Sequence, residues 1–519
     1  MHCRRIDLKD TNSFSKIFID YINQDPSLAP FYDLPPTKKS FKKMIEKRTL
    51  DNKKREILTD ILNQQYSGFQ VSEATGLNIE RLKEKNTYTI TTGHQLNIFT
   101  GPLYFIYKIL TVINACEILN KAHPHHHFIP VYWMASEDHD IDEIRSFSLF
   151  GKQYTWDTGQ TGPVGRMDPG SLKQVLEMLP ERSEIFEKAY LEYGTLAKSV
   201  RYYVNELFGD SGLVVIDADD ATFKSQIIHV LKDDLLDHHA NDLVESTSAE
   251  LAELGYKSQV YPRAINLFYI SGNIRNRIIK EAGVFKVFET DIEFTEDEIL
   301  RELEASPEKF SPNVILRPLY QEIILPNIAY VGGPAEVSYW LQLKSTFDHF
   351  GIQFPILLPR NFALIINKGL MKKMQKLMFS VEEITMPVVE LKNKYMEEHR
   401  EFNVDLESEM KIMEELFESV RNKSKMVDQS LEGFVQAERA KVLKSLENIG
   451  KRINKSEEQK QSVALNQIQN LKDKLFPQGG LQERTDNFLN FYINHPDFLE
   501  DIKNKLDPFD FRFNIIYED

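Results

Sequence analysis

The chain has 519 residues, 42% of them hydrophobic and 27% charged, a composition typical of a soluble globular protein with two or three domains. No apolar run is long enough to span a bilayer, and the first residues, MHCRRIDLKD, lack the apolar segment of a signal peptide, so we expect a cytoplasmic protein without membrane contact. The net charge of −15 argues against sequence-independent nucleic-acid binding, and two cysteines cannot supply a disulfide framework or a cysteine-based zinc site.

The first 370 residues or so predict an α/β core. Up to about residue 85 the sequence predicts short helices, followed by a strand over Thr87 to Gly93, a helix from about Pro102 to Lys121 and a buried strand over His126 to Ala135. This order is a βαβ unit, so we expect a parallel sheet. The glycine-rich segment Gly151 to Gly165 predicts a surface excursion. Further strands are predicted at Gly212 to Asp217, Asn266 to Ile270, Asn313 to Pro318 and Pro355 to Arg360.

After about Gly369 the composition changes to polar residues with apolar residues at heptad spacing, such as Val435, Val442 and Ile449. A polar stretch at 421–425 predicts a turn between two long helices, folded back as an antiparallel coiled coil. Ordinary amphipathic helices packed on the core are the alternative. We therefore predict a core over 1–369 with N-terminal helices and insertions, a helical coiled-coil domain over 370–475, and a segment over 476–519 that returns to the core.

The motif TTGHQLNIFTGPLYFIYK, residues 91–108, follows a predicted strand end, where open α/β sheets bind ligands. Thr100 or Gly101 could cap a helix that starts at Pro102, and the free amides there would attract a carboxylate or phosphate. His94 could donate a hydrogen bond or shuttle a proton near neutral pH. A capped turn in which His94 bonds only to backbone explains the motif equally well at this stage.

A second motif, SEDHDIDEI, follows the next predicted strand and carries six ionisable side chains in seven positions. If Ser136 or Asp138 caps a helix, His139 and Glu143 lie on one helix face. Such a cluster could position a base or bind an amine or metal, whereas a solvated acidic helix start is the alternative. Its place directly after a buried strand favours function.

A third motif, VGGPAEVSYW, places Gly332 and Gly333 before a helix whose first turn carries Glu336. This arrangement indicates a pocket for a polar ligand, with a plain turn as the alternative. Two arginines, Arg317 and Arg360, lie at or near predicted strand ends and could hold a carboxylate in a fork. The segment HPHHH has no matching partner set, so we predict no metal site.

Six segments occur in order along essentially the whole chain: TGHQLNIFTGPLYFIYK, PVYWMASEDHDIDEI, LFGDSGLVVIDADD, FSPNVILRPLYQE, YVGGPAEVSYWLQLK and LFPQGGLQER. Together they resemble the bacillithiol biosynthesis cysteine-adding family, BshC. The resemblance implies addition of cysteine to glucosaminyl-malate through an amide bond, the last step of bacillithiol synthesis. It also implies a Rossmann-like core related to class I aminoacyl-tRNA synthetases and a coiled coil used for homodimerisation. ATP is implied by that analogy and by the need to activate a carboxylate, and a metal requirement stays open.

The motifs and the resemblance predict site residues with assigned roles. The predicted catalytic residues are His94, Gln95, Asp138, His139 and Asp140. The predicted substrate-binding residues are Thr100, Gly101, Tyr104, Lys108, Glu137, Arg317, Gly332, Gly333, Glu336, Tyr339 and Arg360. In this scheme His94 and Gln95 contact an activated carboxyl group or phosphate, Asp138 and Asp140 recognise an amino group, and His139 transfers a proton. Arg317 or Arg360 pairs with the malate carboxylates.

Two other functions stay open at this stage. One is a nucleotidyl-transferring ligase that acts on a different small carboxylate. The other is a non-catalytic scaffold whose coiled coil binds partners. In a scaffold the three polar motifs should be scattered, whereas in an enzyme they should converge on one pocket.

Overall fold

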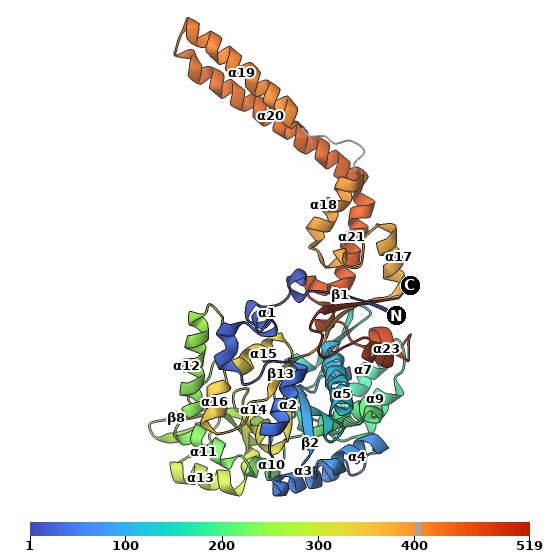
Figure 1. Cartoon of the computed structure of the whole chain (residues 1–519), viewed down its shortest axis with the longest axis vertical. Coiled ribbons are helices and arrows are strands. Elements are labelled where there is room, and N and C mark those ends of the chain that lie inside the picture. Colours follow the sequence, from blue (N-terminus) through green and yellow to red (C-terminus); the bar gives the residue numbers. More distant parts are fainter. Residues whose placement is uncertain (400–405, 519) are drawn as a thin grey trace. The chain divides into compact units, whose positions relative to one another are not determined.

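The computed structural model describes residues 1–399 and 406–518, and they form two compact units (Figure 1). The core unit comprises residues 1–365 and 480–516, and the helical unit comprises residues 366–479 with the last residues of the chain. In the described part of the chain, no helix is long and apolar enough to cross a membrane.

A five-stranded sheet with the order β13-β12-β2-β3-β6 forms the centre of the core unit, and all of its neighbouring strands are parallel. Helix α5 (Tyr104–Ala122) connects β2 to β3 and packs against both, which confirms the predicted βαβ unit. Nearly every residue of these strands is buried, as expected for a parallel sheet covered on both faces. The strands are β2 (Thr87–His94), β3 (His127–Met134), β6 (Val214–Asp217), β12 (Asn327–Gly332) and β13 (Ile356–Pro359).

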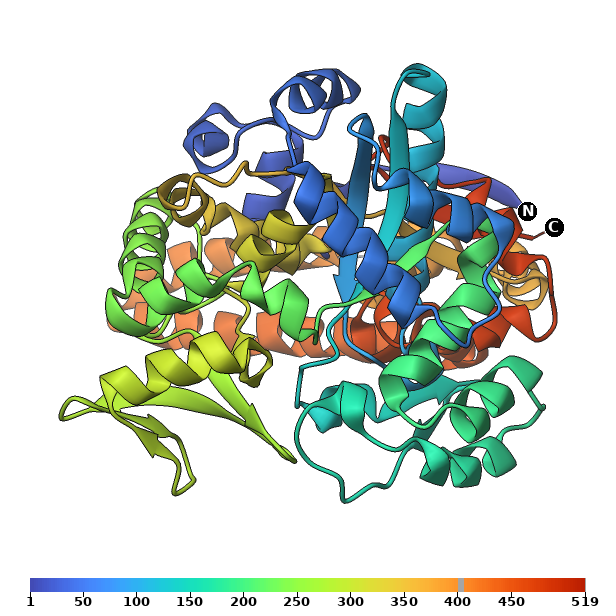
Figure 2. The same ribbon diagram turned by 90° about the horizontal axis from the view of Figure 1, so that it is seen from below.

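The predicted strand at 266–270 is real but belongs to a second, antiparallel sheet with the order β10-β9-β8-β7-β11. Figure 2 shows this sheet, in yellow-green, projecting from one side of the core unit. Its strands are β7 (Leu267–Ser271), β8 (Ile274–Glu281), β9 (Val284–Val287), β10 (Glu293–Phe294) and β11 (Phe310–Pro312).

The predicted strand over Asn313 to Pro318 is wrong, because helix α14 (Arg317–Ile324) begins within it. The side-chain oxygen of Asn313 accepts hydrogen bonds from the backbone of Ile315 and Leu316, which turns the chain into the helix. Pro318 sits in the first turn, where its missing N–H costs nothing. Arg317 is therefore held by a helix start and not by a strand.

The predicted surface excursion at Gly151 to Gly165 is wrong in part. It contains β5 (Lys152–Thr155), which pairs with β4 (Ser146–Leu149), and Trp156 is fully buried. A Cβ atom added to Gly165 would lie 2.5 Å from the Ser136 Cβ, so this segment packs tightly on the core.

Further helices surround the two sheets of the core unit. They are α1 (Lys16–Ile22), α2 (Lys38–Lys47), α3 (Asn52–Gln65), α4 (Glu73–Arg81), α6 (Ile141–Ile144), α7 (Lys173–Met178), α8 (Glu184–Glu192), α9 (Leu196–Phe208), α10 (Ala221–Ser225), α11 (Ile228–Leu236), α12 (His239–Glu253), α13 (Glu296–Ala305), α15 (Pro334–Leu341), α16 (Lys344–His349), α22 (Leu489–Tyr492) and α23 (Phe498–Lys503). The predicted short N-terminal helices correspond to α1 through α4.

The C-terminal part of the chain packs within the core unit. Strand β15 (Phe513–Tyr517) lies between β1 (His2–Ile6) and β14 (Phe362–Ile366). The Gln482 side chain exchanges two hydrogen bonds with the backbone of Ile365, at 2.8 and 3.0 Å. Next to it, the fully buried Glu483 accepts a hydrogen bond from Arg360 at 2.5 Å. This segment thus fixes an arginine at the end of β13.

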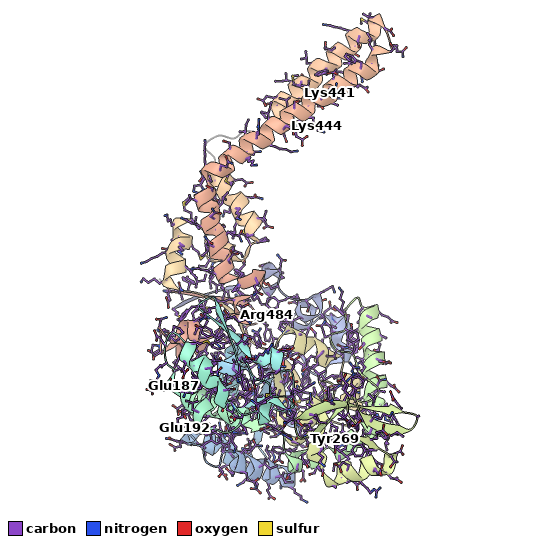
Figure 3. The ribbon with its side chains drawn as sticks, turned by 180° about the vertical axis from the view of Figure 1, so that it is seen from behind. Glu187, Glu192, Tyr269, Lys441, Lys444 and Arg484 are labelled. Atoms are coloured by element: carbon purple, nitrogen blue, oxygen red, sulfur yellow. The ribbon has the colours of Figure 1, made fainter. Side chains whose placement is uncertain are left out.

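The helical unit contains the predicted coiled coil. Helices α19 (Glu407–Val427) and α20 (Leu431–Lys460) form a hairpin whose antiparallel pairing is marked by the ion pair between Arg439 and Glu414 at 2.7 Å. The turn lies at residues 428–430 and not at the predicted 421–425. Lys441 and Lys444 (Figure 3) lie on the exposed surface of α20. The other helices are α17 (Lys368–Lys376), α18 (Val388–His399) and α21 (Ser462–Leu475).

Replacing Glu483 by glutamine should destabilise the core unit, because the guanidinium group of Arg360 would stay buried without its counter-charge. Loss of one partner of a buried ion pair costs about 3–5 kcal/mol. Urea denaturation measures this loss as a lower free energy of unfolding. The matched control is Glu187→Gln, which removes the exposed ion pair with Arg182 and should leave stability unchanged. Equal stability of the two variants would contradict this account of the C-terminal segment.

Candidate active site

A cavity of about 530 Å³ lies in the core unit at the carboxyl edge of the parallel sheet. This is the edge where open α/β sheets bind ligands, because the strands end there and helices begin. Nine predicted site residues line it: His94, Gln95, Tyr104, Lys108, Arg317, Gly333, Glu336, Tyr339 and Arg360. Eight lining residues were not predicted as site residues: Gly93, Trp133, Ala135, Glu143, Tyr330, Pro334, Ala335 and Arg484.

His94 is the last residue of β2 and is nearly buried. Its Nδ1 lies 2.8 Å from the backbone oxygen of Gln95, which can only accept, so Nδ1 carries the proton and Nε2 is an acceptor. Nε2 is buried and has no hydrogen-bond partner among the described residues. Burial, followed by the nearby charge of Lys108, lowers the pKa of His94 to about 3. The expectation that His94 titrates near neutral pH is therefore wrong for the free protein.

Gln95 connects the cavity to the acidic motif. Its amide nitrogen donates hydrogen bonds to Asp138 at 2.8 Å and to Glu143 at 2.5 Å. Burial opposes ionisation of Asp138, but hydrogen bonds from His139 and Gln95 and the charge of Arg275 outweigh it and lower the pKa of this carboxyl group. Asp138 thus remains ionised and orients the Gln95 side chain.

The predicted helix cap in the acidic motif is wrong. Helix α6 (Ile141–Ile144) is a single turn, and Asp140, not Ser136 or Asp138, is its N-cap. His139 therefore precedes the helix and does not share a face with Glu143. Its Nδ1 lies 2.9 Å from Arg275 Nη1. A sequence pattern alone could not show this distant arginine.

Four predicted site residues of the acidic motif, Glu137, Asp138, His139 and Asp140, do not line the cavity. Glu137 instead contacts the fully buried Lys224, which also lies 3.7 Å from Asp219. These contacts are an ion network within the core, and Glu143 is the member of the motif that reaches the cavity.

The predicted helix start at Pro102 is wrong, because α5 begins at Tyr104 and no side chain caps it. Phe99, Thr100 and Gly101 all have positive φ, with values of 51°, 69° and 62°, and this backbone conformation cannot form a helix start. A Cβ atom on Gly101 would lie 2.6 Å from the Cβ of Asn97. Thr100 and Gly101 therefore form a tight turn and do not line the cavity.

Helix α5 does reach the cavity through Tyr104 and Lys108, which are one turn apart on the same face. The Lys108 Nζ lies 2.5 Å from Glu336 and donates to the backbone oxygen of Gly93 at 2.8 Å. Glu336 also accepts hydrogen bonds from Tyr330 at 2.6 Å and from the backbone of Gly333 at 2.9 Å. Burial opposes ionisation of Glu336, but Lys108 outweighs it and the carboxyl pKa is lowered.

The two glycines of the third motif differ in position. Gly333 lines the cavity, whereas Gly332 does not. A Cβ atom on Gly332 would lie 3.1 Å from the Glu336 Cβ, so this glycine permits close packing of the strand end on α15.

Two arginines supply hydrogen-bond donors that the protein leaves unused. Arg317 Nη1 donates to Gln321 at 3.0 Å, the guanidinium group also interacts with the Tyr339 side chain, and its Nη2 is buried without a close hydrogen-bond partner among the described residues. Arg360 donates to Glu483 and to the backbone oxygen of Asn361, and its Nε is buried and equally unpartnered in the described part of the chain. Unsatisfied buried donors are costly, so they indicate an acceptor that binds from outside.

The charges that line the cavity favour an anion. Four cationic side chains, Lys108, Arg317, Arg360 and Arg484, face two carboxylates, Glu143 and Glu336. Lys108 is paired with Glu336 and Arg360 with Glu483, so Arg317 and Arg484 are the lining cations without a carboxylate partner among the described residues. Arginine matches the planar shape of carboxylates and phosphates, so the cavity is suited to a ligand with several anionic groups.

Comparison with known proteins identifies similar chains over the full length. The N-terminal Rossmann-like domain of bacillithiol biosynthesis BshC matches residues 1–361, and the C-terminal coiled-coil domain of BshC matches residues 363–518. Proteins named "Putative cysteine ligase BshC" from Flavobacterium psychrophilum and Cytophaga hutchinsonii are 42% and 40% identical, and each alignment covers 98% of both chains.

A crystal structure titled as a putative arginyl tRNA synthetase from Campylobacter jejuni covers 88% of this chain and 95% of its own, with 10% identity and a TM-score of 0.23. A TM-score of 0.23 does not indicate a shared fold. The relation to class I aminoacyl-tRNA synthetases therefore stays a prediction, whereas the Rossmann-like domain and the coiled-coil domain are confirmed by the family match.

The His94 imidazole should stay neutral, with its proton on Nδ1, when the pH falls from about 8 to about 4. The pKa of His94 is lower in the folded protein than in the unfolded chain. Below about pH 6.5 the unfolded chain therefore binds more protons at His94 than the folded protein does. As the pH falls further, this difference lowers the free energy of unfolding by up to about 1.4 kcal/mol per pH unit. Nitrogen NMR of the imidazole measures both the tautomer and the titration. A His94 midpoint near 6.5 would contradict the buried environment described above.

Proposed function

Because the chain belongs to the bacillithiol biosynthesis BshC family, we propose that it is a cysteine ligase that joins cysteine to glucosaminyl-malate. In this reaction an amide bond forms between the cysteine carboxyl carbon and the sugar amine nitrogen, and a carboxyl oxygen leaves. The observation that carries the proposal is the pair of buried guanidinium groups, Arg317 and Arg360, each with an unused N–H donor, on one cavity at the carboxyl edge of the sheet.

The malate part of the acceptor fits these donors. A malate unit carries two carboxylates, and Arg317 and Arg360 each offer an unused donor to the same cavity. A charge-assisted hydrogen bond from each guanidinium group would hold one carboxylate and thereby fix the sugar amine in place. Arg360 is itself oriented by Glu483 and Asn361, so its free Nε has a defined direction.

His94 and Gln95 would act next to the reacting groups. The Nε2 of neutral His94 can accept a hydrogen bond from the attacking amine, which orients the nitrogen lone pair toward the carboxyl carbon. Gln95 would contact the carboxyl group by redirecting the Nε2 hydrogen that it now donates to Glu143, and Asp138 would act as a positioning residue that holds the Gln95 side chain. Direct contact of Asp138 or Asp140 with an amino group, and proton transfer by His139, stay predictions.

We infer that ATP is a co-substrate, because a carboxylate and an amine do not condense in water without activation. Transfer of a phosphoryl group from ATP, with release of ADP, or of an adenylyl group, with release of pyrophosphate, would make one cysteine carboxylate oxygen part of a good leaving group. When the amine attacks the carboxyl carbon, that oxygen would depart with phosphate or AMP, and the amine nitrogen would lose a proton to solvent. The positive charge of the cavity fits an anionic co-substrate. Arg484, exposed at the rim and without an ion pair in the described part of the chain, could meet a phosphate.

The helical unit supports a proposed homodimer. In a single copy of the chain, the α19–α20 hairpin has exposed large apolar side chains, among them Ile412, Leu416, Phe434 and Ile449. A second copy of the hairpin would cover such residues, as coiled coils do. We also propose a cytoplasmic location, in line with the sequence features.

The two alternatives are weaker. A scaffold would leave the polar motifs scattered, yet the first and third motifs and both arginines meet on one cavity. A nucleotidyl-transferring ligase with a different carboxylate would use the same donors, so it differs from our proposal in substrate identity alone.

Purified protein supplied with cysteine, glucosaminyl-malate and ATP should form the amide-linked thiol, which mass spectrometry detects. Arg317→Met should raise KM for glucosaminyl-malate by at least about tenfold, since one charge-assisted hydrogen bond contributes about 1.5–3 kcal/mol. Arg301→Met, on the exposed face of α13, is the control and should leave KM unchanged.

Three outcomes separate the alternatives. Absence of the product with and without ATP would contradict the cysteine ligase assignment. Product formation only with a different acceptor would replace glucosaminyl-malate in the proposal. A normal KM in Arg317→Met, together with full activity, would remove Arg317 from the acceptor site.

A further inference from the structure

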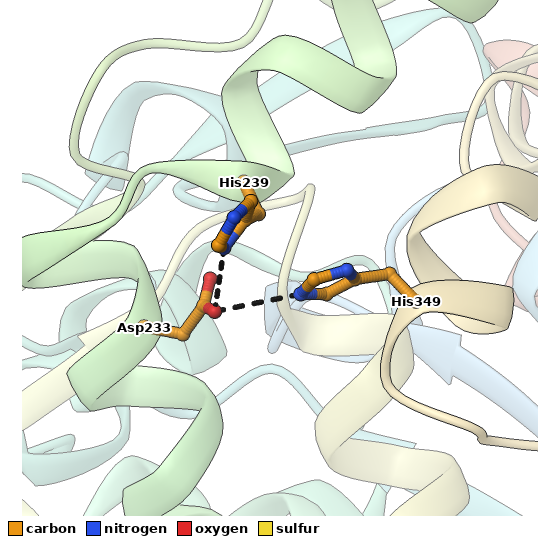
Figure 4. A group of neighbouring side chains, drawn as sticks. All are labelled: Asp233, His239 and His349. Atoms are coloured by element: carbon orange, nitrogen blue, oxygen red, sulfur yellow. Dashed lines mark hydrogen bonds and ion pairs between the residues drawn. The ribbon is translucent and has the colours of Figure 1, made fainter.

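Outside the cavity, one cluster combines the side chains that zinc prefers. Asp233 on α11, His239 at the start of α12 and His349 at the end of α16 point toward one another (Figure 4). One ligand atom from each residue lies within 4.8 Å of the other two. None of the three lines the cavity, so they are not explained by the proposed reaction.

The distances are close to those of a metal site. Asp233 Oδ2 lies 2.8 Å from His239 Nδ1 and 3.5 Å from His349 Nε2. Zinc–nitrogen and zinc–oxygen bonds of about 2.0–2.2 Å in a tetrahedron place the ligand atoms about 3.3–3.6 Å apart. Small side-chain rotations would therefore bring the three atoms onto one ion, with a fourth position for water.

A second observation indicates a missing partner. Asp233 Oδ1 is buried and accepts no hydrogen bond from any described residue. The surroundings are also acidic, since Asp237 and Asp242, in addition to Asp233, act electrostatically on His239. A cation would satisfy this negative charge, and two neutral imidazoles with one carboxylate favour zinc over calcium or magnesium.

The backbone holds the three residues in place without the metal. A tight turn joins α11 to α12: His238 has a φ of 59°, and its backbone N–H and that of Asp237 both donate to the Asp233 carbonyl oxygen. Helix α12 is tied to α16 by a hydrogen bond of 2.7 Å between Thr247 and Ser345. Ligands on such fixed elements lose little freedom when an ion binds.

We propose that Asp233, His239 and His349 form a zinc site that joins α11, α12 and α16. The alternative is a plain pair between Asp233 and a protonated His239, with His349 as a bystander. The zinc site and the plain ion pair differ in the role of His349, because only the zinc site needs this side chain. The chain offers a matched example of a plain pair in His495 and Asp501, whose side chains lie 2.8 Å apart.

The test uses full-length protein, purified without a histidine tag and freed of metal with a chelator. Zinc is titrated against a chromophoric competitor, and thermal unfolding is followed with and without zinc. We expect one tight site per chain and a higher melting temperature with zinc. His239→Ala and His349→Ala should each weaken zinc binding by at least about 10–100-fold, because loss of a residue that only hydrogen-bonds to a metal ligand already has an effect of this size. Each variant should also abolish the rise in melting temperature with zinc.

Two controls make the result decisive. His495→Ala should bind zinc as the parent protein does. The double variant His125→Ala, His126→Ala removes two of the four histidines of the HPHHH segment, residues 123–127, and should also keep the tight site. Binding that survives in His349→Ala, or that disappears only in the double variant, would overturn the proposal, as would no tight binding at all. Circular dichroism verifies that each variant is folded, and the exposure of His239 and His349 makes misfolding a minor concern.

Discussion

Burial of the parallel sheet on both faces is the constraint on which the site depends. Strands β2, β3 and β12 are buried almost throughout, so polar groups can reach solvent or a ligand only where these strands end. His94, Gly333 and Arg360 are all at or next to such ends. The cavity follows from that arrangement, because each strand delivers its last residues to the same edge.

Buried charged side chains at that edge need partners within the protein. The hydrogen-bonding groups that have no such partner are the ones available to a ligand. Glu336 neutralises Lys108, and Glu483 neutralises Arg360 from a segment more than a hundred residues away. Arg317 receives a neutral partner, Gln321. Among the described residues that line the cavity, the buried side-chain atoms without a hydrogen-bond partner are the donors Arg317 Nη2 and Arg360 Nε and the acceptor His94 Nε2. A ligand with carboxylates and an amine offers acceptors to the arginines and a donor to His94.

The sequence predicts the local parts of this structure better than the long-range ones. The βαβ unit and the coiled coil follow from apolar periodicity, which is a property of neighbouring residues. The apolar residues VIL within 313–318 predict a strand, but the Asn313 side chain accepts hydrogen bonds from the backbone of Ile315 and Leu316 and turns the chain toward α14. The acidic motif predicts a group that positions a base or binds an amine or metal, but Glu137 and His139 contact Lys224 and Arg275, which lie far along the chain. Arg484 ends the LFPQGGLQER segment, far along the chain from the other lining residues, and reaches the cavity only through folding.

A crystal structure of the protein with glucosaminyl-malate bound tests the central claim most directly. The account predicts the malate carboxylates in the cavity, within hydrogen-bond distance of Arg317 Nη2 and Arg360 Nε, and the sugar amine near His94 Nε2. Density for the acceptor at another surface, with both arginines still unpartnered, would contradict it.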